Sequence, residues 1–184
     1  MIDLLRFCYP GPDREHLTTP FAVEVDGVRW GCATDGHTLV AVAGAPVDRD
    51  AGDLGSAIAG AVAGYLRPPE SPVRVAVATL RAWAAAPQWR HRCKCGECGE
   101  EYAERTPGDR PGWLTVGAVR ARMDRGGVAR VLADVPDEEI AVEATAPDDA
   151  VLFVGAGWRA AIMPLAYRED ARADAHTLAI GGAP

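Results

Sequence analysis

The sequence has only one lysine, Lys94, and two serines, Ser56 and Ser71. Neither serine lies in the Gly-x-Ser-x-Gly motif that presents a hydrolase nucleophile. The glycines of residues 52–64 have neither the spacing of a phosphate-binding Walker loop nor that of a dinucleotide-binding loop. These absences remove the common signatures of hydrolases, nucleotidases and dehydrogenases, so we expect a protein that is not an enzyme.

Long apolar segments are also missing. No run of about 18 apolar residues occurs, so the sequence predicts no membrane-spanning helix and no membrane partner. Residues 1–6, Met-Ile-Asp-Leu-Leu-Arg, lack the basic start and the long apolar core of a signal peptide. We therefore expect a cytoplasmic protein.

Positive charge is scarce. The chain carries 19 Lys and Arg against 26 Asp and Glu, a net charge of -7. This balance argues against coating of nucleic acid by overall charge, although it leaves room for a local basic surface. With 184 residues, of which 48% are hydrophobic, the chain is long enough for one domain with a buried core.

The first half of the chain predicts strands followed by helices. Apolar and polar residues alternate between 21 and 42, and Asp26-Gly27 and Asp35-Gly36 are typical of two-residue hairpin turns, so we expect a three-stranded meander. A four-residue apolar spacing, from Leu54 to Leu66, predicts a helix there. The remaining segments of this half are expected to form short strands at 2–8 and 73–77 and a helix at 79–86.

The second half mirrors that order. Residues 113–116 predict a strand, and a helix is expected from there to Arg125, stopped by Gly126-Gly127. Four strands are expected to follow, at 128–133, 138–144, 150–154 and 157–163. Residues 88–111 have the composition of an insertion, and 167–184 that of a loosely held tail. The sequence thus predicts an α+β domain over 1–166, built of two similar helix-plus-sheet halves.

Two segments carry a family resemblance. Residues 32–42 read Cys-Ala-Thr-Asp-Gly-His-Thr-Leu-Val-Ala-Val, and residues 157–165 read Gly-Trp-Arg-Ala-Ala-Ile-Met-Pro-Leu after an apolar strand at 151–153. The first resembles a strand–turn–strand segment, and the second the final hairpin, of bacterial DNA polymerase III β sliding clamps. Residues 113–125 resemble the helix that precedes that hairpin. The resemblance implies the DNA clamp fold.

In that family the two segments line one groove, which binds short hydrophobic peptides of polymerases and other DNA-handling proteins. The resemblance therefore implies a replication scaffold that recruits replication or repair proteins. Leu39 and Met163 would form an apolar floor, and Met adapts to varied partners. Thr38 stands where the family has Arg, which removes a charged wall. The groove residues implied by position are Thr34, Gly36, His37, Leu39, Ala161, Met163 and Pro164.

The resemblance also implies DNA as a partner, held nonspecifically through its backbone. Arg122 and Arg125 lie on the polar side of the helix expected before residue 126, with Arg81 and Arg67 as further candidates for phosphate contacts. Solvated surface charge is the alternative interpretation of all four arginines. A clamp subunit of this family has three domains, whereas this chain has room for one, so a closed ring would be a homo-oligomer of about six copies.

Three of the five cysteines, Cys93, Cys95 and Cys98, lie together with His91. Structural zinc takes four nitrogen or sulfur ligands, so this cluster predicts a zinc site with His91 as the nearest fourth ligand. Cys8, Cys32, His37 and His176 are remote alternatives for that position. A disulfide or a metal-free loop also stays open, as does a monomeric zinc-binding adaptor that never encircles DNA. A metal-dependent enzyme using these residues is a third hypothesis.

Overall fold

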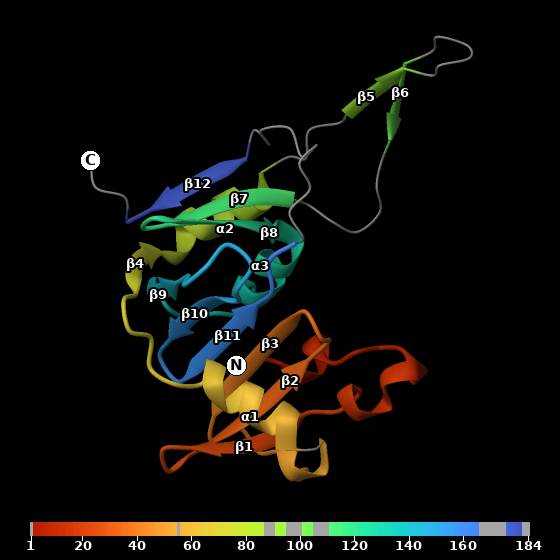
Figure 1. Cartoon of the computed structure of the whole chain (residues 1–184), viewed down its shortest axis with the longest axis vertical. Coiled ribbons are helices and arrows are strands. Elements are labelled where there is room, and N and C mark those ends of the chain that lie inside the picture. The colour runs from red at the N-terminus through yellow and green to blue at the C-terminus, as the bar shows by residue number, and fades with distance from the viewer. Residues whose placement is uncertain are drawn as a thin grey trace.

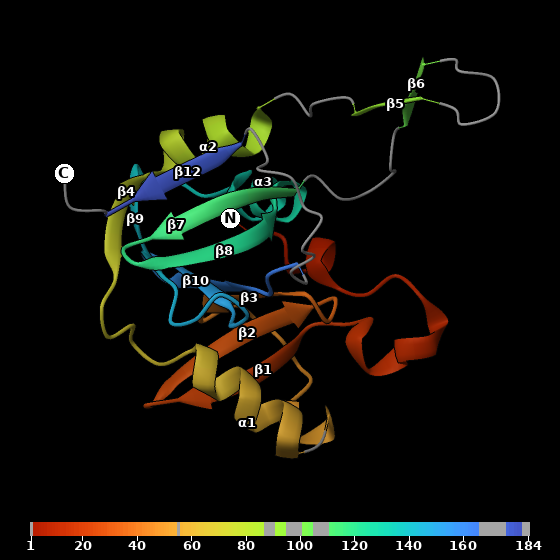
Figure 2. The same ribbon diagram turned by 45° about the horizontal axis from the view of Figure 1, so that its top comes forward.

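The computed structural model describes residues 2–54, 56–86, 91–94, 101–104, 111–165 and 176–181. Its strands form a seven-stranded sheet, a three-stranded sheet and a two-stranded sheet. Figures 1 and 2 show the two larger sheets in one body, with helices packed on them. This is the predicted α+β class. Within the described ranges, no helix has the length and apolar character needed to cross a membrane.

The predicted N-terminal meander is confirmed as β1 (Phe21–Val25), β2 (Val28–Thr34) and β3 (Thr38–Ala43). Asp26 and Gly27 have positive φ values of 52° and 75°, as a two-residue hairpin turn requires. The second turn is longer than predicted, because Thr34 pairs with Leu39 and residues 35–38 connect them.

The segment before β1 is helical rather than extended. Residues 2–8 were expected to form a strand, but Leu4–Phe7 forms a 3₁₀ helix, η1, followed by a second, η2 (Pro12–Leu17). The Asp3 carboxylate accepts a hydrogen bond from the Leu5 N–H at 3.0 Å, which caps η1 at its start. Leu4 and Phe7 are buried in the core.

The two ends of the chain meet in the seven-stranded sheet. The predicted C-terminal strands are confirmed as β9 (Glu139–Glu143), β10 (Val151–Gly155) and β11 (Trp158–Ile162). Together with β4 (Val73–Ala76) they complete the order β1-β2-β3-β11-β10-β9-β4. Antiparallel pairing of β3 with β11 joins the N-terminal meander to the C-terminal hairpin. Residues more than 100 positions apart thereby become neighbours.

Helices cover both faces of this sheet. The predicted first helix is confirmed as α1 (Ser56–Tyr65), preceded by the 3₁₀ turn η3 (Ala51–Leu54), and it packs on one face with Phe21, Trp30 and Leu39. The larger core on the other face includes α2 (Val77–Ala85) and α3 (Arg125–Leu132). Each of the latter two helices begins at the residue after a strand, which repeats one strand-to-helix unit.

One predicted helix is wrong. Residues 116–124 belong to a hairpin of β7 (Pro111–Val116) and β8 (Val119–Asp124), and the helix α3 occupies the place of the strand expected at 128–133. The buried Leu114 and Val116 flank the less buried Thr115, and the buried Ala121 and Met123 flank the less buried Arg122, which is the strand period of two. Gly126 and Gly127 begin a helix instead of ending one, because the Asp124 carboxylate accepts hydrogen bonds from both of their amides.

The end of the chain is not wholly irregular. Residues 167–184 were expected to be a loose tail, but Thr177–Ile180 forms β12, which pairs in parallel with β7, and Ile180 is buried in the core. In the insertion, β5 (His91–Lys94) and β6 (Glu101–Glu104) pair with each other. Figures 1 and 2 show this hairpin standing away from the body of the molecule.

Candidate functional site

The two segments that resemble clamp sequences lie side by side. Thr38 pairs with Ile162 across the β3–β11 ladder. One residue further out, the Met163 N–H donates a hydrogen bond to the His37 carbonyl at 2.8 Å. The β2–β3 turn and the residues that follow β11 are therefore fixed to each other through the backbone.

A pocket of about 590 Å³ opens beside this junction. Its lining comes from three segments, namely the apolar residues at the end of β11 and after it, the β2–β3 turn and the start of α3. Met163 is 37% exposed and belongs to a small set of large apolar side chains at the surface. We call this pocket the groove; its lining residues are Asp35, His37, Thr38, Asp124, Gly126, Gly127, Arg130, Ile162, Met163, Pro164 and Leu165.

Side chains of the β2–β3 turn hold its own backbone. One Asp35 carboxylate oxygen accepts hydrogen bonds from the N–H groups of His37 at 3.0 Å and Thr38 at 2.8 Å. The Thr34 hydroxyl accepts another from the Gly36 N–H at 3.0 Å. Gly36 has a φ of 94°, a conformation that side chains disfavour. The turn is thus shaped by its own sequence before any distant contact is made.

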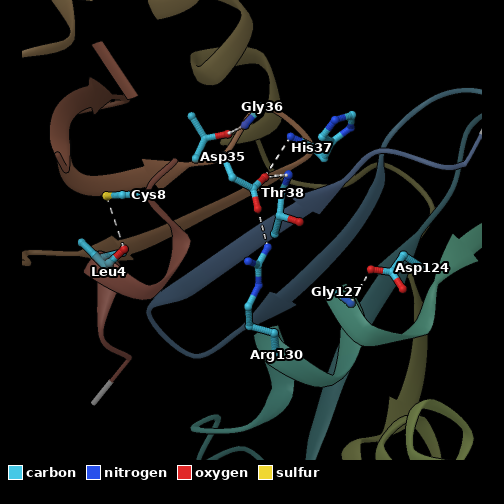
Figure 3. Close-up of polar contacts among 10 residues, drawn as sticks. Leu4, Cys8, Asp35, Gly36, His37, Thr38, Asp124, Gly127 and Arg130 are labelled. Carbon is cyan, nitrogen blue, oxygen red and sulfur yellow. Dashed lines mark hydrogen bonds and ion pairs between the residues drawn. The ribbon is translucent and has the colours of Figure 1, made fainter. Parts of the chain in front are cut away.

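A distant contact then fixes this turn to α3. The Arg130 guanidinium donates a hydrogen bond to the second Asp35 carboxylate oxygen at 2.5 Å (Figure 3). Burial acts to raise the pKa of Asp35, but the bonds from Arg130 and from the His37 and Thr38 amides outweigh it and lower that pKa below 3.8. Asp35 is therefore charged throughout the neutral range and holds its cationic partner.

The start of α3 forms the polar wall of the groove. The Asp124 carboxylate accepts hydrogen bonds from the Gly126 and Gly127 amides at 2.9 Å each. Figure 3 shows Asp124 and Gly127 opposite the turn that carries His37 and Thr38. After β11 the chain passes alongside β8, where the Leu165 N–H donates a hydrogen bond to the Arg122 carbonyl at 2.7 Å. Backbone hydrogen bonds therefore hold the segment after β11 to the β2–β3 turn at one end and to β8 at the other.

Not all predicted groove residues reach the groove. His37, Met163 and Pro164 line it. Leu39, expected in the floor of the groove, and Ala161, expected among its residues, pair with each other and are buried on the opposite face of the sheet, in the core beneath α1. Side chains alternate along a strand, so when Thr38 and Ile162 face the groove, the next residues within the same strands, Leu39 and Ala161, must face away. Thr34 and Gly36 lie in the adjacent turn and act on its shape.

Most of the other lining residues were not predicted from the sequence, among them the three charged ones, Asp35, Asp124 and Arg130. Asp124 carried a usable signal, since an Asp directly before a helix is a typical N-cap, but the helix was expected to end there. The Asp35–Arg130 pair joins residues 95 positions apart, and no local pattern in the sequence indicates it.

Known proteins match this chain in fold and not in sequence. No family model and no curated protein matches the sequence. Solved structures do match. The DNA polymerase III subunit β of Pseudomonas aeruginosa is 13% identical with a TM-score of 0.55, over 88% of this chain and 61% of that one. The subunit β of Borrelia burgdorferi is 9% identical with a TM-score of 0.57, over 90% and 59%. The sliding clamp of Bacillus subtilis is 12% identical with a TM-score of 0.53, over 90% of this chain and 60% of that one.

The chain has the fold of a DNA sliding clamp. It spans about 60% of the length of the clamps that it matches. The segments at 32–42 and 157–165, which resemble clamp sequences, are the two that meet at the groove.

The four arginines proposed for DNA contact do not share one surface of this clamp fold. Arg125 is completely buried and donates hydrogen bonds to the carbonyls of Trp83 and Ala86, at 3.0 and 2.7 Å, so the proposed contact with phosphate is wrong for this residue. Arg81 donates to the Leu132 and Val135 carbonyls at the end of α3. Arg122 lies on strand β8 rather than on a helix, and Arg67 follows α1 on the other side of the sheet.

The predicted zinc site lies largely outside the described residues. Cys95 and Cys98 are not among them, and His91 and Cys93 are described only as backbone of β5. No group of three or more potential metal ligands occurs in the described ranges. Of the alternative ligands, Cys32 is fully buried, and burial raises the pKa of its thiol to about 12. Zinc binds the deprotonated thiolate, so a raised pKa makes Cys32 a weaker ligand than an exposed cysteine.

Proposed function

We propose that this chain is a clamp-like scaffold of DNA replication that recruits partner proteins by binding a short apolar peptide in the groove. The observation that carries the proposal is the meeting of His37 and Met163. These two residues are among those that the clamp resemblance assigns to a peptide site, they come from segments far apart in the chain, and both line one pocket.

The groove has the physical properties that a short apolar peptide needs. Its volume of about 590 Å³ lies within the range of roughly 300–1,000 Å³ that is usual for ligand sites. Ile162, Met163, Pro164 and Leu165 supply apolar contact on one side. The flexible thioether of Met163 adapts to side chains of different shape. Since the proposed mechanism is binding only, no catalytic residue is assigned.

DNA and further copies of the chain belong to the same proposal. A chain of about 60% of the clamp length would need other copies to surround a duplex. Contacts with phosphates would be nonspecific, with Arg122, Arg81 and Arg67 as the remaining candidates among the four arginines. Structural zinc in the cysteine-rich insertion, held by Cys93, Cys95, Cys98 and His91, is a separate part of the proposal.

The groove is tested by truncating its exposed apolar side chain. A fluorescein-labelled library of hexapeptides with two large apolar residues is screened against the wild-type chain, and the best binder is titrated by fluorescence anisotropy. Met163→Ala is expected to weaken its affinity about tenfold or more, because a buried anchor at an interface contributes about 1–2 kcal/mol. Leu5→Ala is the matched control: Leu5 is 66% exposed but lies in η1, outside the groove lining.

Two results would count against the groove. Equal affinity of the wild-type chain and the Met163→Ala variant would remove Met163 from the binding site. An equal loss in the Met163→Ala and Leu5→Ala variants would indicate nonspecific apolar adhesion rather than recognition.

A further inference from the structure

Arg130 spans the groove from its helix to its turn. It lies on α3, whereas Asp35 lies in the β2–β3 turn, and the bond between them is 2.5 Å long. Their side chains are 35% and 18% exposed, less than those of the surface pair Arg29–Asp50 at 49% and 66%. An ion pair that is partly shielded from water and salt is stronger than one on the surface.

A third element limits where Arg130 can lie. Its guanidinium carbon is 5.2 Å from the centre of the Phe7 ring, and Phe7 in η1 is only 2% exposed. A planar guanidinium stacks on an aromatic face and still offers its edge to a carboxylate, which a lysine ammonium cannot do. The pair therefore connects η1, the β2–β3 turn and α3 at one point.

The connection continues to the apolar wall of the groove. Asp35 uses one carboxylate oxygen for Arg130 and the other for the amides of His37 and Thr38. The His37 carbonyl in turn accepts the hydrogen bond from the Met163 N–H. A displacement of Asp35 is thus transmitted to Met163 through two consecutive hydrogen bonds, which meet at the backbone of His37.

We propose that Arg130 is a positioning residue of the groove, which sets the place of Met163 relative to α3 by holding Asp35. The expected effect on peptide affinity rests on the proposed function. The effect on the position of Met163 can be tested without a peptide. Arg130 itself need not contact the bound peptide.

The side-chain methyl group of Met163 reports this position directly. The chain has three methionines, and Met123 is fully buried whereas Met163 is 37% exposed, so methyl-labelled methionine gives few and distinguishable NMR signals. Arg130→Gln is expected to shift the Met163 methyl signal and to leave that of Met123 in place. Asp35→Asn keeps an oxygen for the turn amides but loses the charge, so it is expected to give the same shift. Arg29→Gln, which breaks the surface pair on the same strand as Thr34, is expected to give none.

The pH dependence separates positioning from a general effect on folding. Two basic side chains lie near Asp35: Arg130, which belongs to α3, and Arg14 of η2, which approaches the turn at Gly36. Asp124 at the start of α3 and His37 of the same turn line the groove together with Asp35. Because the pKa of Asp35 is lowered in the folded chain, the pair persists as the pH falls through 3.8 and is lost only below it. In the wild-type chain the Met163 methyl signal should change below pH 3.8, and in Arg130→Gln that change should move to higher pH.

The peptide titration completes the test. Arg130→Gln is expected to weaken the affinity for the hexapeptide about tenfold, and Arg130→Lys, which keeps the charge, should recover part of it. An unchanged Met163 methyl signal in both Arg130→Gln and Asp35→Asn would overturn the inference even if peptide binds normally. A shifted methyl signal in a chain whose wild type binds no peptide would support the positioning role while removing the proposed function.

Discussion

At the residue scale, the groove depends on which side of a strand each residue occupies. Thr38 and Leu39 are adjacent in sequence, yet one lines the groove and the other lies in the core beneath α1. Ala161 and Ile162 show the same division on the neighbouring strand. A motif match places a residue near a site, but the two-residue period of the strand decides whether its side chain enters the site.

Arg125 shows that a charged residue expected at the surface can lie in the interior. It is completely buried at the first position of α3, and its guanidinium donates to two carbonyls at the end of α2. Carbonyls at a helix end have no partner within the helix, so a cation there satisfies them and interacts favourably with the helix dipole. Arg125 therefore stabilises the contact between α2 and α3.

We predict that Arg125→Met lowers the free energy of unfolding by about 2–4 kcal/mol, since it removes the buried guanidinium that donates to the Trp83 and Ala86 carbonyls. Urea denaturation followed by circular dichroism measures this change. Arg67→Met, at an exposed residue after α1, is the control and should change stability by less than about 0.5 kcal/mol. Unaltered stability of Arg125→Met combined with weaker binding to a DNA duplex would restore Arg125 to the DNA-contacting surface.

At the element scale, period alone misassigned one segment. Val116, Val119 and Met123 have helical spacing, but the same stretch alternates in burial as a β7–β8 hairpin that turns at Gly117, where φ is 57°. The partner strand decided between the two, because pairing of Leu114 with Ala121 places both side chains in the core. Where one set of apolar residues fits both the helix period and the strand period, pairing with a neighbouring strand determines which element forms.

The cysteine-rich insertion is also an element with its own prediction. Four sulfur and nitrogen ligands, Cys93, Cys95, Cys98 and His91, are expected to hold one zinc ion per chain. Metal analysis of protein purified without chelator should find about one zinc per chain. Cys95→Ser is expected to lose that metal, whereas Cys32→Ser is expected to retain it because Cys32 is buried in the sheet. Metal-free protein that folds normally would remove the prediction.

At the scale of the whole molecule, one strand pair defines the site. The β3–β11 ladder joins the meander to the final hairpin and makes a continuous seven-stranded sheet. The groove, the Arg130 contact and the match to sliding clamps all depend on this junction. Any change that separates β3 from β11 would therefore remove the site as a unit.

The assembly of the chain is predicted at the same scale. If it closes a clamp-like ring, static light scattering should give the mass of several chains, compared with 19.4 kDa for one. Measurement over a range of protein concentrations, with and without a circular DNA duplex, distinguishes a stable ring from an assembly that forms on DNA. A mass of 19.4 kDa under all these conditions would favour the monomeric adaptor over the ring.

The sequence by itself determined the elements whose signals are local. The Asp26-Gly27 turn requires positive φ, the meander and the last hairpin alternate without ambiguity, and α1 repeats every four residues, so each was predicted close to its observed position. Only the tertiary structure decided the segment 113–132, the faces of Leu39 and Ala161, the burial of Arg125 and the Asp35–Arg130 pair. The physical reason is that these features depend on contacts between residues far apart in the chain, whose free energy is gained only when the strands and helices have packed.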